Sequence, residues 1–288
     1  MEIGRLYRSV RDRFREAGLA TPDLDAKRLV GAALALPVSD LILKEWDLAG
    51  EEAVALAQAY ARQRLAGMPV GRILGERDFY GRRFFLNAAT LEPRPDTETL
   101  VDAVLERSAP EDAMIVCDIG TGTGAIAVSL LAERPNCRAI AVDLSADALD
   151  CALRNADLHR VADRMLPVRA DFASALRPSS PAVPGTGFDW VVSNPPYIRS
   201  AVLAGLSREV TEHDPVLALD GGEDGLTAYL RIVPEAASLL RAGGRIGLEI
   251  GYDQADEVKK QLRHHGFGEI EIIGDLSGND RVAVARKA

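Results

Sequence analysis

The sequence lacks the features that would place it in a membrane, outside the cell or around a metal ion. No apolar run approaches the roughly 18 residues that a membrane span needs. The N-terminus, MEIGRLYRSVRDRFREAG, is charged and amphipathic and has no apolar core of a signal peptide. The three cysteines are scattered, and their odd number is typical of a reducing compartment. The four histidines form no ligand pattern. We therefore predict a cytoplasmic protein with no metal site and no membrane contact.

Positive charge is also in short supply. The net charge is −9, and the excess of acidic residues is located in residues 96–288. We therefore expect no stable nucleic-acid partner. Nothing in the sequence demands a dimer, and we expect a monomer. Five arginines nevertheless lie close together and form either a solvated face or a docking edge for a partner: Arg72, Arg77, Arg82, Arg83 and Arg94.

The first third of the chain falls into two parts. Residues 1–70 show apolar residues at helical spacing, and Thr21-Pro22-Asp23 is a helix start signal with the threonine hydroxyl as the expected cap. We predict a small helical domain for recognition or support. Residues 71–95 are interrupted by glycine and proline, which predicts a linker with a β-hairpin around Gly81-Arg82.

Residues 96–288 alternate strands and helices, which predicts a doubly wound, Rossmann-like α/β sheet of seven strands. A stretch rich in proline and serine, residues 176–187, is expected to be a surface loop. The candidate strands are Met114–Asp118, Arg138–Val142, Met165–Arg169, Asp189–Ser193, Arg245–Ile250, Glu269–Ile273 and Arg281–Ala285.

A glycine-rich loop follows the first strand of this domain, in the segment CDIGTGTGAIA. Glycines between a strand and a helix let the backbone approach a ligand closely. Asp143 ends the next strand, where a carboxylate can accept both hydroxyls of a ribose. A nucleoside-bearing cofactor is therefore expected, and because GTGTGA also satisfies the dinucleotide fingerprint, a nicotinamide dehydrogenase stays open. The candidate cofactor residues are Asp118, Gly120, Thr121, Gly122, Thr123, Gly124 and Asp143, although Asp118 could simply cap the next helix.

Asp171 and Phe172 follow the third strand. A carboxylate beside an aromatic ring suits a purine, because the carboxylate accepts from the exocyclic amino group while the ring stacks. Phe172 could equally be a core residue of a short helix.

The most unusual stretch is FDWVVSNPPYIR, an apolar strand that ends in Asn194, two prolines and Tyr197. The Asn194 side-chain oxygen and the Pro195 carbonyl can accept from the two hydrogens of a planar NH₂ group. Pro195 and Pro196 hold the backbone rigidly, and Tyr197 offers a ring for stacking. Accepting both hydrogens favours charge building on nitrogen during attack on a sulfonium-bound methyl group. Hydride transfer needs none of this, so the motif favours S-adenosyl-L-methionine over a nicotinamide cofactor.

With these motifs and several others, the chain resembles the bacterial glutamine N5-methyltransferases that modify peptide chain release factors. The likeness covers nearly the whole chain. The further matching segments are GRILGERDFYG, LEPRPDTETLVDAVL, AVDLSADAL, ALDGGEDGL, LEIGYDQA and DLSGNDRVAVA.

The resemblance implies a function and a set of site residues. Residues 96–288 would be the methyltransferase domain, with S-adenosyl-L-methionine at the glycine loop, its ribose at Asp143 and its adenine at Phe172, where relatives often have tryptophan. Residues 194–197 would grip the glutamine amide of the Gly-Gly-Gln motif in class I release factors. The N-terminal helices would contact the body of the factor, and Glu92 replaces an aliphatic residue common in relatives.

Two points stay open after the resemblance. The segment from Arg94 to Glu98 either contacts the substrate, with Arg94 as a candidate, or caps the next helix through Asp96 or Thr97. The Asn-Pro-Pro-Tyr motif is shared with adenine amino-methyltransferases of DNA or RNA, which would usually need a basic groove or a separate recognition domain. A non-catalytic binding module is a third interpretation, against which the intact motif speaks.

Overall fold

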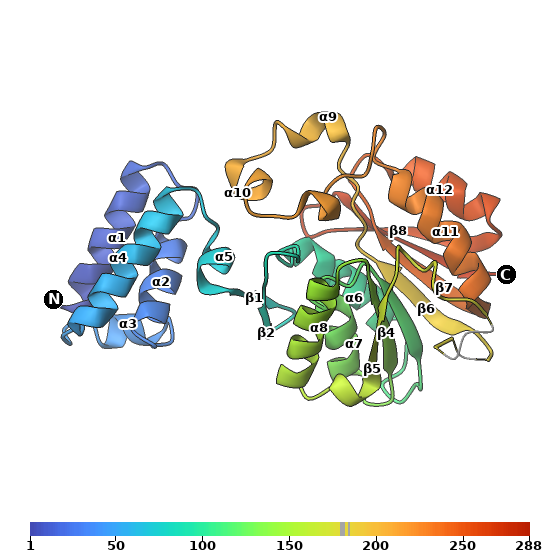
Figure 1. The fold of residues 1–288 in the computed structure, drawn as a ribbon, viewed down its shortest axis with the longest axis horizontal. Coiled ribbons are helices and arrows are strands. Elements are labelled where there is room, and N and C mark those ends of the chain that lie inside the picture. The colour runs from blue at the N-terminus through green and yellow to red at the C-terminus, as the bar shows by residue number, and fades with distance from the viewer. Residues whose placement is uncertain (179–181, 184) are drawn as a thin grey trace. The chain divides into compact units, whose positions relative to one another are not determined.

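The computed structural model describes residues 1–178, 182–183 and 185–288, and these form two compact units (Figure 1). The first unit contains residues 1–76 and 208–213, and the second contains residues 77–207 and 214–288. Residues 179–181 and 184, within the loop predicted at 176–187, lie outside the described residues. Across the described part of the chain, no helix combines the length and the apolarity needed to cross a membrane.

The first unit is helical and packs around the apolar faces of its longer helices, with Leu6, Phe14 and Leu29 fully buried. Thr21 precedes the second helix as predicted, but its expected capping role is wrong. The Thr21 hydroxyl donates to Asp25 Oδ1 at 2.9 Å instead of accepting from a backbone N–H. The helices are α1 (Ile3–Glu16), α2 (Pro22–Ala33), α3 (Asp40–Leu43), α4 (Glu51–Leu65), α5 (Val70–Leu74) and α10 (Arg208–Thr211).

A β-hairpin of β1 (Glu76–Phe79) and β2 (Arg82–Phe85) follows, as the sequence predicts, but its turn is one residue earlier than expected. Tyr80 and Gly81 occupy the two central positions with φ values of +49° and +68°. A two-residue turn with positive φ at both positions matches the twist of the flanking strands. The Tyr80 N–H donates to Glu98 Oε1 at 2.7 Å, which helps to hold this otherwise unfavourable tyrosine conformation.

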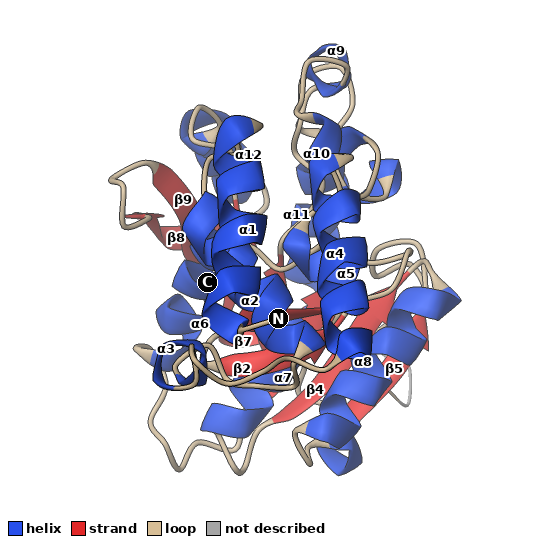
Figure 2. Cartoon of the chain, turned by 90° about the vertical axis from the view of Figure 1, so that its left-hand side faces the viewer, coloured by secondary structure: helices blue, strands red, loops and turns tan. Residues whose placement is uncertain are grey.

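The second unit contains the predicted seven-stranded sheet, in the order β5-β4-β3-β6-β7-β9-β8, with helices on both faces (Figures 1 and 2). The strands from β5 to β7 are parallel, and β9 runs antiparallel to both of its neighbours. The strands are β3 (Ile115–Ile119), β4 (Arg138–Asp143), β5 (Met165–Arg169), β6 (Phe188–Ser193), β7 (Leu240–Glu249), β8 (Phe267–Gly274) and β9 (Asp280–Lys287).

Each face of the sheet has its own core, because successive side chains of a strand point to opposite faces. Trp190 and Val192 of β6 pack with one set of helices, whereas Val191 packs with the other. The first set is α6 (Glu98–Leu105), α7 (Ala125–Glu133) and α8 (Ala146–Leu158); the second is α11 (Thr227–Leu239) and α12 (Ala255–His264). Short elements complete the chain: 3-10 turns at Pro95–Thr97, Ala162–Arg164 and Val216–Ala218, and α9 (Ser200–Leu203).

The topology places a ligand crevice between β3 and β6. Chain order runs outward from β3 to β4 and β5 on one side, and from β6 to β7 on the other, so these two central strands flank the switch point. Ligands of open α/β sheets bind at this place, beyond the carboxyl ends of the strands. The glycine loop follows β3 and the Asn-Pro-Pro-Tyr motif follows β6, so both candidate motifs lie at this edge.

Candidate active site

The glycine loop adopts a conformation that only glycine tolerates easily. Gly120, Gly122 and Gly124 all have positive φ, between +55° and +78°. A Cβ at Gly120 or Gly122 would meet nothing within 4 Å, whereas one at Gly124 would lie 3.1 Å from Ala152 Cβ. The first two glycines therefore keep one side of the loop open, and the third lets α7 pack closely against α8.

Two carboxylates support this loop. Asp118 is fully buried; its Oδ2 accepts from the Thr121 hydroxyl at 2.7 Å and from the Ala127 N–H at 3.3 Å, so it does stabilise the start of α7. Its Oδ1 is buried without a hydrogen bond from any described residue. Burial, with a smaller contribution from the nearby Asp143 charge, raises the pKa of Asp118 to about 7.

Asp143 is positioned by the backbone around it. Its Oδ2 accepts from the Gly122 N–H and its Oδ1 from the Ser145 N–H, both at 2.9 Å. Each carboxylate oxygen can accept more than one hydrogen bond, so ribose hydroxyls can still be bound. The buried orphan oxygen of Asp118, the open side of the glycine loop and this fixed carboxylate fit a nucleoside-bearing cofactor that carries a further hydrogen-bond donor.

Phe172 follows β5, the neighbour of β4 in the sheet, and has an unusual backbone conformation. The Ala170 N–H donates to the Asp143 carbonyl at 3.0 Å, and Phe172 has φ +49°, which is unfavourable for a bulky residue. The ring is half-buried against the core, and the Arg231 guanidinium lies 5.1 Å from its centroid. Arg231 also pairs with Asp171 at 3.2 Å. The structure thus places both residues just after β5, next to the end of β4 that carries Asp143, and their adenine-binding roles stay predictions.

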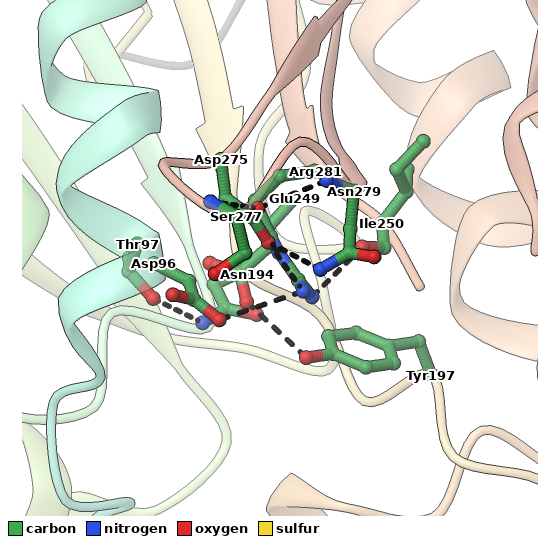
Figure 3. Close-up of polar contacts among 10 residues, drawn as sticks. All are labelled: Asp96, Thr97, Asn194, Tyr197, Glu249, Ile250, Asp275, Ser277, Asn279 and Arg281. Atoms are coloured by element: carbon green, nitrogen blue, oxygen red, sulfur yellow. Dashed lines mark hydrogen bonds and ion pairs between the residues drawn. The ribbon is translucent and has the colours of Figure 1, made fainter. Parts of the chain in front are cut away.

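The Asn-Pro-Pro-Tyr motif begins immediately beside the glycine loop. Asp118 pairs with Val192 in the parallel register of β3 and β6, and the Ser193 hydroxyl donates to the Ile119 carbonyl at 2.6 Å. Asn194 Nδ2 donates to Thr97 Oγ1 at 3.1 Å, which leaves Asn194 Oδ1 without a hydrogen bond among the described residues (Figure 3). The motif therefore presents an unsatisfied amide oxygen next to the end of β3, from which the glycine loop begins.

Tyr197 is held at both its ends. Its hydroxyl donates to Glu249 Oε1 at 3.3 Å, and its backbone carbonyl accepts from Gln254 Nε2 at 3.1 Å. Gln254 is itself buried and donates to the Gly225 carbonyl at 3.0 Å. The segments ALDGGEDGL and LEIGYDQA resemble the family, but sequence reasoning assigned them no role. In the structure they hold the backbone and the ring of Tyr197 in place.

A cluster of charged residues lies beside Asn194 and Tyr197 (Figure 3). Sequence reasoning offered Asp96 only as part of the Arg94–Glu98 segment and assigned the other members no role in the site. Glu249 ends β7 and is 1% exposed. Arg281, at the start of β9, pairs with Asp275 at 3.0 Å and with Asp96 at 3.4 Å. Burial raises the pKa of Glu249 to about 7, while the Arg281 charge and the hydrogen bond from the Tyr197 hydroxyl act in the opposite direction. For Glu249, Asp275 and Arg281, the only signal in the sequence was a position at or next to the end of a strand, within a segment that resembles the family.

The Arg94–Glu98 segment makes no side-chain cap for α6, which was one of the two interpretations, and its contact with the substrate stays a prediction. Thr97 precedes α6 but makes no side-chain cap, and its hydroxyl contacts Asn194 instead. Asp96 also makes no cap and pairs with Arg281. Arg94 pairs with the buried Asp214 at 2.6 Å, so its substrate-binding role stays a prediction.

Part of the arginine-rich edge is internally paired. Arg82 pairs with Glu133 at 2.7 Å, and Arg77 pairs with Glu92 at 3.1 Å. Glu92 is 5% exposed, so this acid is the buried partner of Arg77. These pairs favour the interpretation of a structural, solvated edge over a docking edge.

Fold and site define this protein as a methyltransferase of the doubly wound α/β class. The model of the Methyltransferase small domain matches residues 95–211, and that of the PrmC N-terminal domain matches residues 5–75. Over 80% of the chain, the fold is similar to 99% of a methyltransferase from Pyrococcus furiosus, with a TM-score of 0.53 and 16% identity.

Two relatives are similar over nearly the whole sequence. The release factor glutamine methyltransferase of Agrobacterium fabrum is 38% identical over 97% of this chain and 95% of its own. That of Bradyrhizobium diazoefficiens is 42% identical over 97% of this chain and 93% of its own. The chain belongs to the release factor glutamine methyltransferase family.

Proposed function

We propose that this enzyme transfers a methyl group from S-adenosyl-L-methionine to the side-chain amide nitrogen of the glutamine in the Gly-Gly-Gln motif of class I release factors. The observation that carries the proposal is the position of Asn194. Its amide oxygen accepts no hydrogen bond from the described residues, and it lies one strand away from a glycine loop built for a nucleoside-bearing cofactor. Family membership then indicates the substrate.

The cofactor-binding residues have distinct tasks. Gly120 and Gly122 let the cofactor lie against the backbone, and Asp143 accepts from its ribose hydroxyls. Asp118 Oδ1 is a buried acceptor suited to the cationic amino group of the methionine moiety. Phe172 supplies a flat surface for the adenine. When bound, S-adenosyl-L-methionine supplies an electrophilic methyl group on a sulfonium.

The substrate amide is held by acceptors rather than attacked by a base. The Asn194 oxygen and the Pro195 carbonyl accept from the two hydrogens of the glutamine NH₂ group, and Pro196 limits movement of that carbonyl. The amide nitrogen would form its bond to the methyl carbon as the bond from that carbon to the sulfonium sulfur breaks, which would leave a neutral thioether. The nitrogen would gain positive charge, which both acceptors stabilise, and would then release one of its two hydrogens as a proton to solvent. Tyr197 packs against the flat amide. The Arg94–Asp214 ion pair holds the first residue of the 94–98 segment, which also contains Thr97, the contact of Asn194.

The helical N-terminal domain, which the sequence places at residues 1–70, contacts the body of the release factor and so supplies affinity beyond the short glutamine loop. The enzyme acts as a monomer in the cytoplasm, where release factors work.

The proposal is tested by offering the enzyme two acceptors in parallel. Purified protein is incubated with methyl-labelled S-adenosyl-L-methionine and either a class I release factor or duplex DNA. We expect label on the release factor and none on DNA. Label on adenine would establish the amino-methyltransferase alternative instead, and no label on either acceptor would overturn the proposal.

A further inference from the structure

The buried side-chain amide of Gln254 has no part in the reaction as described so far. Gln254 stands in the loop between β7 and α12 and is 4% exposed. Its Nε2 donates to the carbonyls of Tyr197 at 3.1 Å and Gly225 at 3.0 Å. Its Oε1 accepts from the Gly251 N–H at 2.9 Å, and the Tyr229 hydroxyl lies 3.2 Å from the same oxygen. The amide therefore joins the loops that follow β6 and β7 to the loop that precedes α11.

The neighbours of this amide allow only one orientation. A backbone carbonyl can only accept a hydrogen bond, and a backbone N–H can only donate one. The two carbonyls must therefore face the NH₂ group of Gln254, and the Gly251 N–H must face its oxygen. Both N–H donors of the amide are used in this way. A carboxylate or an apolar side chain of the same length would leave the two carbonyls without these donors.

Glycines bring the loop before α11 against the backbone of the same tyrosine. A Cβ at Gly221 would lie 2.8 Å from Tyr197 Cα, and one at Gly225 would lie 2.5 Å from the Tyr197 carbonyl oxygen. The Gly225 Cβ would also lie 2.6 Å from Gln254 Nε2. The Gly221 N–H donates to the Ile198 carbonyl at 2.8 Å. The backbone at the end of the Asn-Pro-Pro-Tyr motif is thus held both by this loop and by the Gln254 amide.

The anchoring of Tyr197 matters because the proposed substrate acceptor lies just before it in the chain. The Pro195 carbonyl has to stay free for the glutamine NH₂ group, so it can be held only through its neighbours. On the upstream side, the Ser193 hydroxyl donates to the Ile119 carbonyl at 2.6 Å. On the downstream side, the ring of Pro196 fixes its own φ. Few free dihedral angles therefore separate the Pro195 carbonyl from the anchored Tyr197 carbonyl.

We propose that Gln254 is a positioning residue for methyl transfer, which sets the place of the Pro195 carbonyl by anchoring the Tyr197 carbonyl. Gln254 acts through the motif and touches neither substrate nor cofactor. The inference rests on the proposed function, since it assigns Gln254 to the reaction of that site. A displaced acceptor no longer stabilises the charge that develops on the substrate nitrogen, and a displacement of about 1 Å can reduce turnover about 100-fold.

The test measures kcat, KM for the release factor and Kd for S-adenosyl-L-methionine in the wild type and in Gln254→Glu. Glutamate keeps the length and shape of the side chain, but a carboxylate oxygen would face the two carbonyls in place of the donor. We expect kcat to fall about 10- to 100-fold, KM to change less than kcat, and Kd to stay nearly unchanged. Rates are corrected for the folded fraction, which is measured by urea unfolding. Gln261→Glu, the same substitution at a partly exposed position of α12, should behave as the wild type.

Gly225→Ala disturbs the same carbonyl from another side and carries the test if Gln254→Glu folds poorly. Its Cβ would press on the Tyr197 carbonyl, so kcat should again fall about 10- to 100-fold. Gly266→Ala is the matched control, because φ is +81° there and +78° at Gly225, but a Cβ at Gly266 would meet nothing within 4 Å. Both variants carry similar backbone strain, and only Gly225→Ala should slow the enzyme. Because Gln254 and Gly225 act on one carbonyl, the double variant should lose less than the product of the two single losses.

The outcomes separate this inference from the proposed function. An inactive wild type would overturn the proposed function. An active wild type, together with Gln254→Glu and Gly225→Ala variants that keep its kcat, would overturn the positioning role of Gln254 alone. The same conclusion would follow if the losses appeared only as weaker cofactor binding, or if Gly266→Ala slowed the enzyme as much as Gly225→Ala.

Discussion

Replacing Glu249 by glutamine should make the sheet unit more stable at alkaline pH. The ordinary pKa of this carboxyl is 4.5, and burial raises it to about 7 in the folded protein. The difference corresponds to a cost of about 3 kcal/mol for holding the ionised group in the fold above pH 7. Below pH 4.5 the carboxyl is protonated in both states, and this cost is absent. The stability contributed by Glu249 therefore falls as pH rises from 4.5 through 7.

The assay is urea unfolding followed by the fluorescence of Trp190, which lies buried in β6 and reports on the sheet unit. The second tryptophan, Trp46, is 71% exposed and is removed by Trp46→Phe in every protein compared. At pH 8.5, Glu249→Gln should exceed its Glu249 parent by up to about 3 kcal/mol. At pH 5 the two should approach each other.

The difference between the two proteins is the informative quantity, because Asp118 titrates in the same range and cancels in it. A gap that does not change between pH 5 and 8.5 would refute the argument. A variant that is less stable than its parent at pH 8.5 would show that the carboxylate stabilises the fold, and the stated cost would be wrong.

Three further predictions follow from the site and its supports. Asn194→Ala should bind S-adenosyl-L-methionine normally by calorimetry but lose about 100- to 1,000-fold in turnover; unchanged turnover would remove Asn194 from the reaction. Gly124→Ala should cost about 1–3 kcal/mol in urea unfolding, because its φ is +78° and Ala152 is 3.1 Å away; Gly268→Ala, with open space around it, is the control and should not match that loss. Glu92→Leu should destabilise by about 1–3 kcal/mol by leaving Arg77 unpaired, and Arg77→Leu in the same chain should recover part of this; additive losses would show that the pair is not coupled.

The sheet, its helices and the two motifs could be predicted because each depends on local pattern. Short apolar runs predict the strands, and the clustered glycines predict a loop after β3. The two prolines end β6 whatever the rest of the fold is. The hairpin turn was misplaced by one residue because Tyr80, rather than Arg82, adopts positive φ. Hydrogen bonds of Tyr80 to α6, a distant segment, favour that choice.

The polar surroundings of the motif could not be predicted, because they join residues far apart in sequence. Asn194 meets Thr97 across 97 positions, and Arg94 meets Asp214 across 120. From the sequence, Thr97 is predicted to cap α6, because threonine is strongly preferred at the residue before a helix. Only the folded sheet brings it beside Asn194. For the same reason, the sequence shows Glu249 only as an acidic residue at the end of an apolar strand and does not show its contact with Tyr197.

The central claim is that the glutamine amide held by Asn194 receives the methyl group. The most direct test is tandem mass spectrometry of the release factor after incubation with the enzyme and S-adenosyl-L-methionine, beside an identical reaction with Asn194→Ala. The account predicts one added methyl group on the side-chain nitrogen of the glutamine in Gly-Gly-Gln, and its near absence with the variant. A methyl group on another residue, or equal methylation by both proteins, would contradict it.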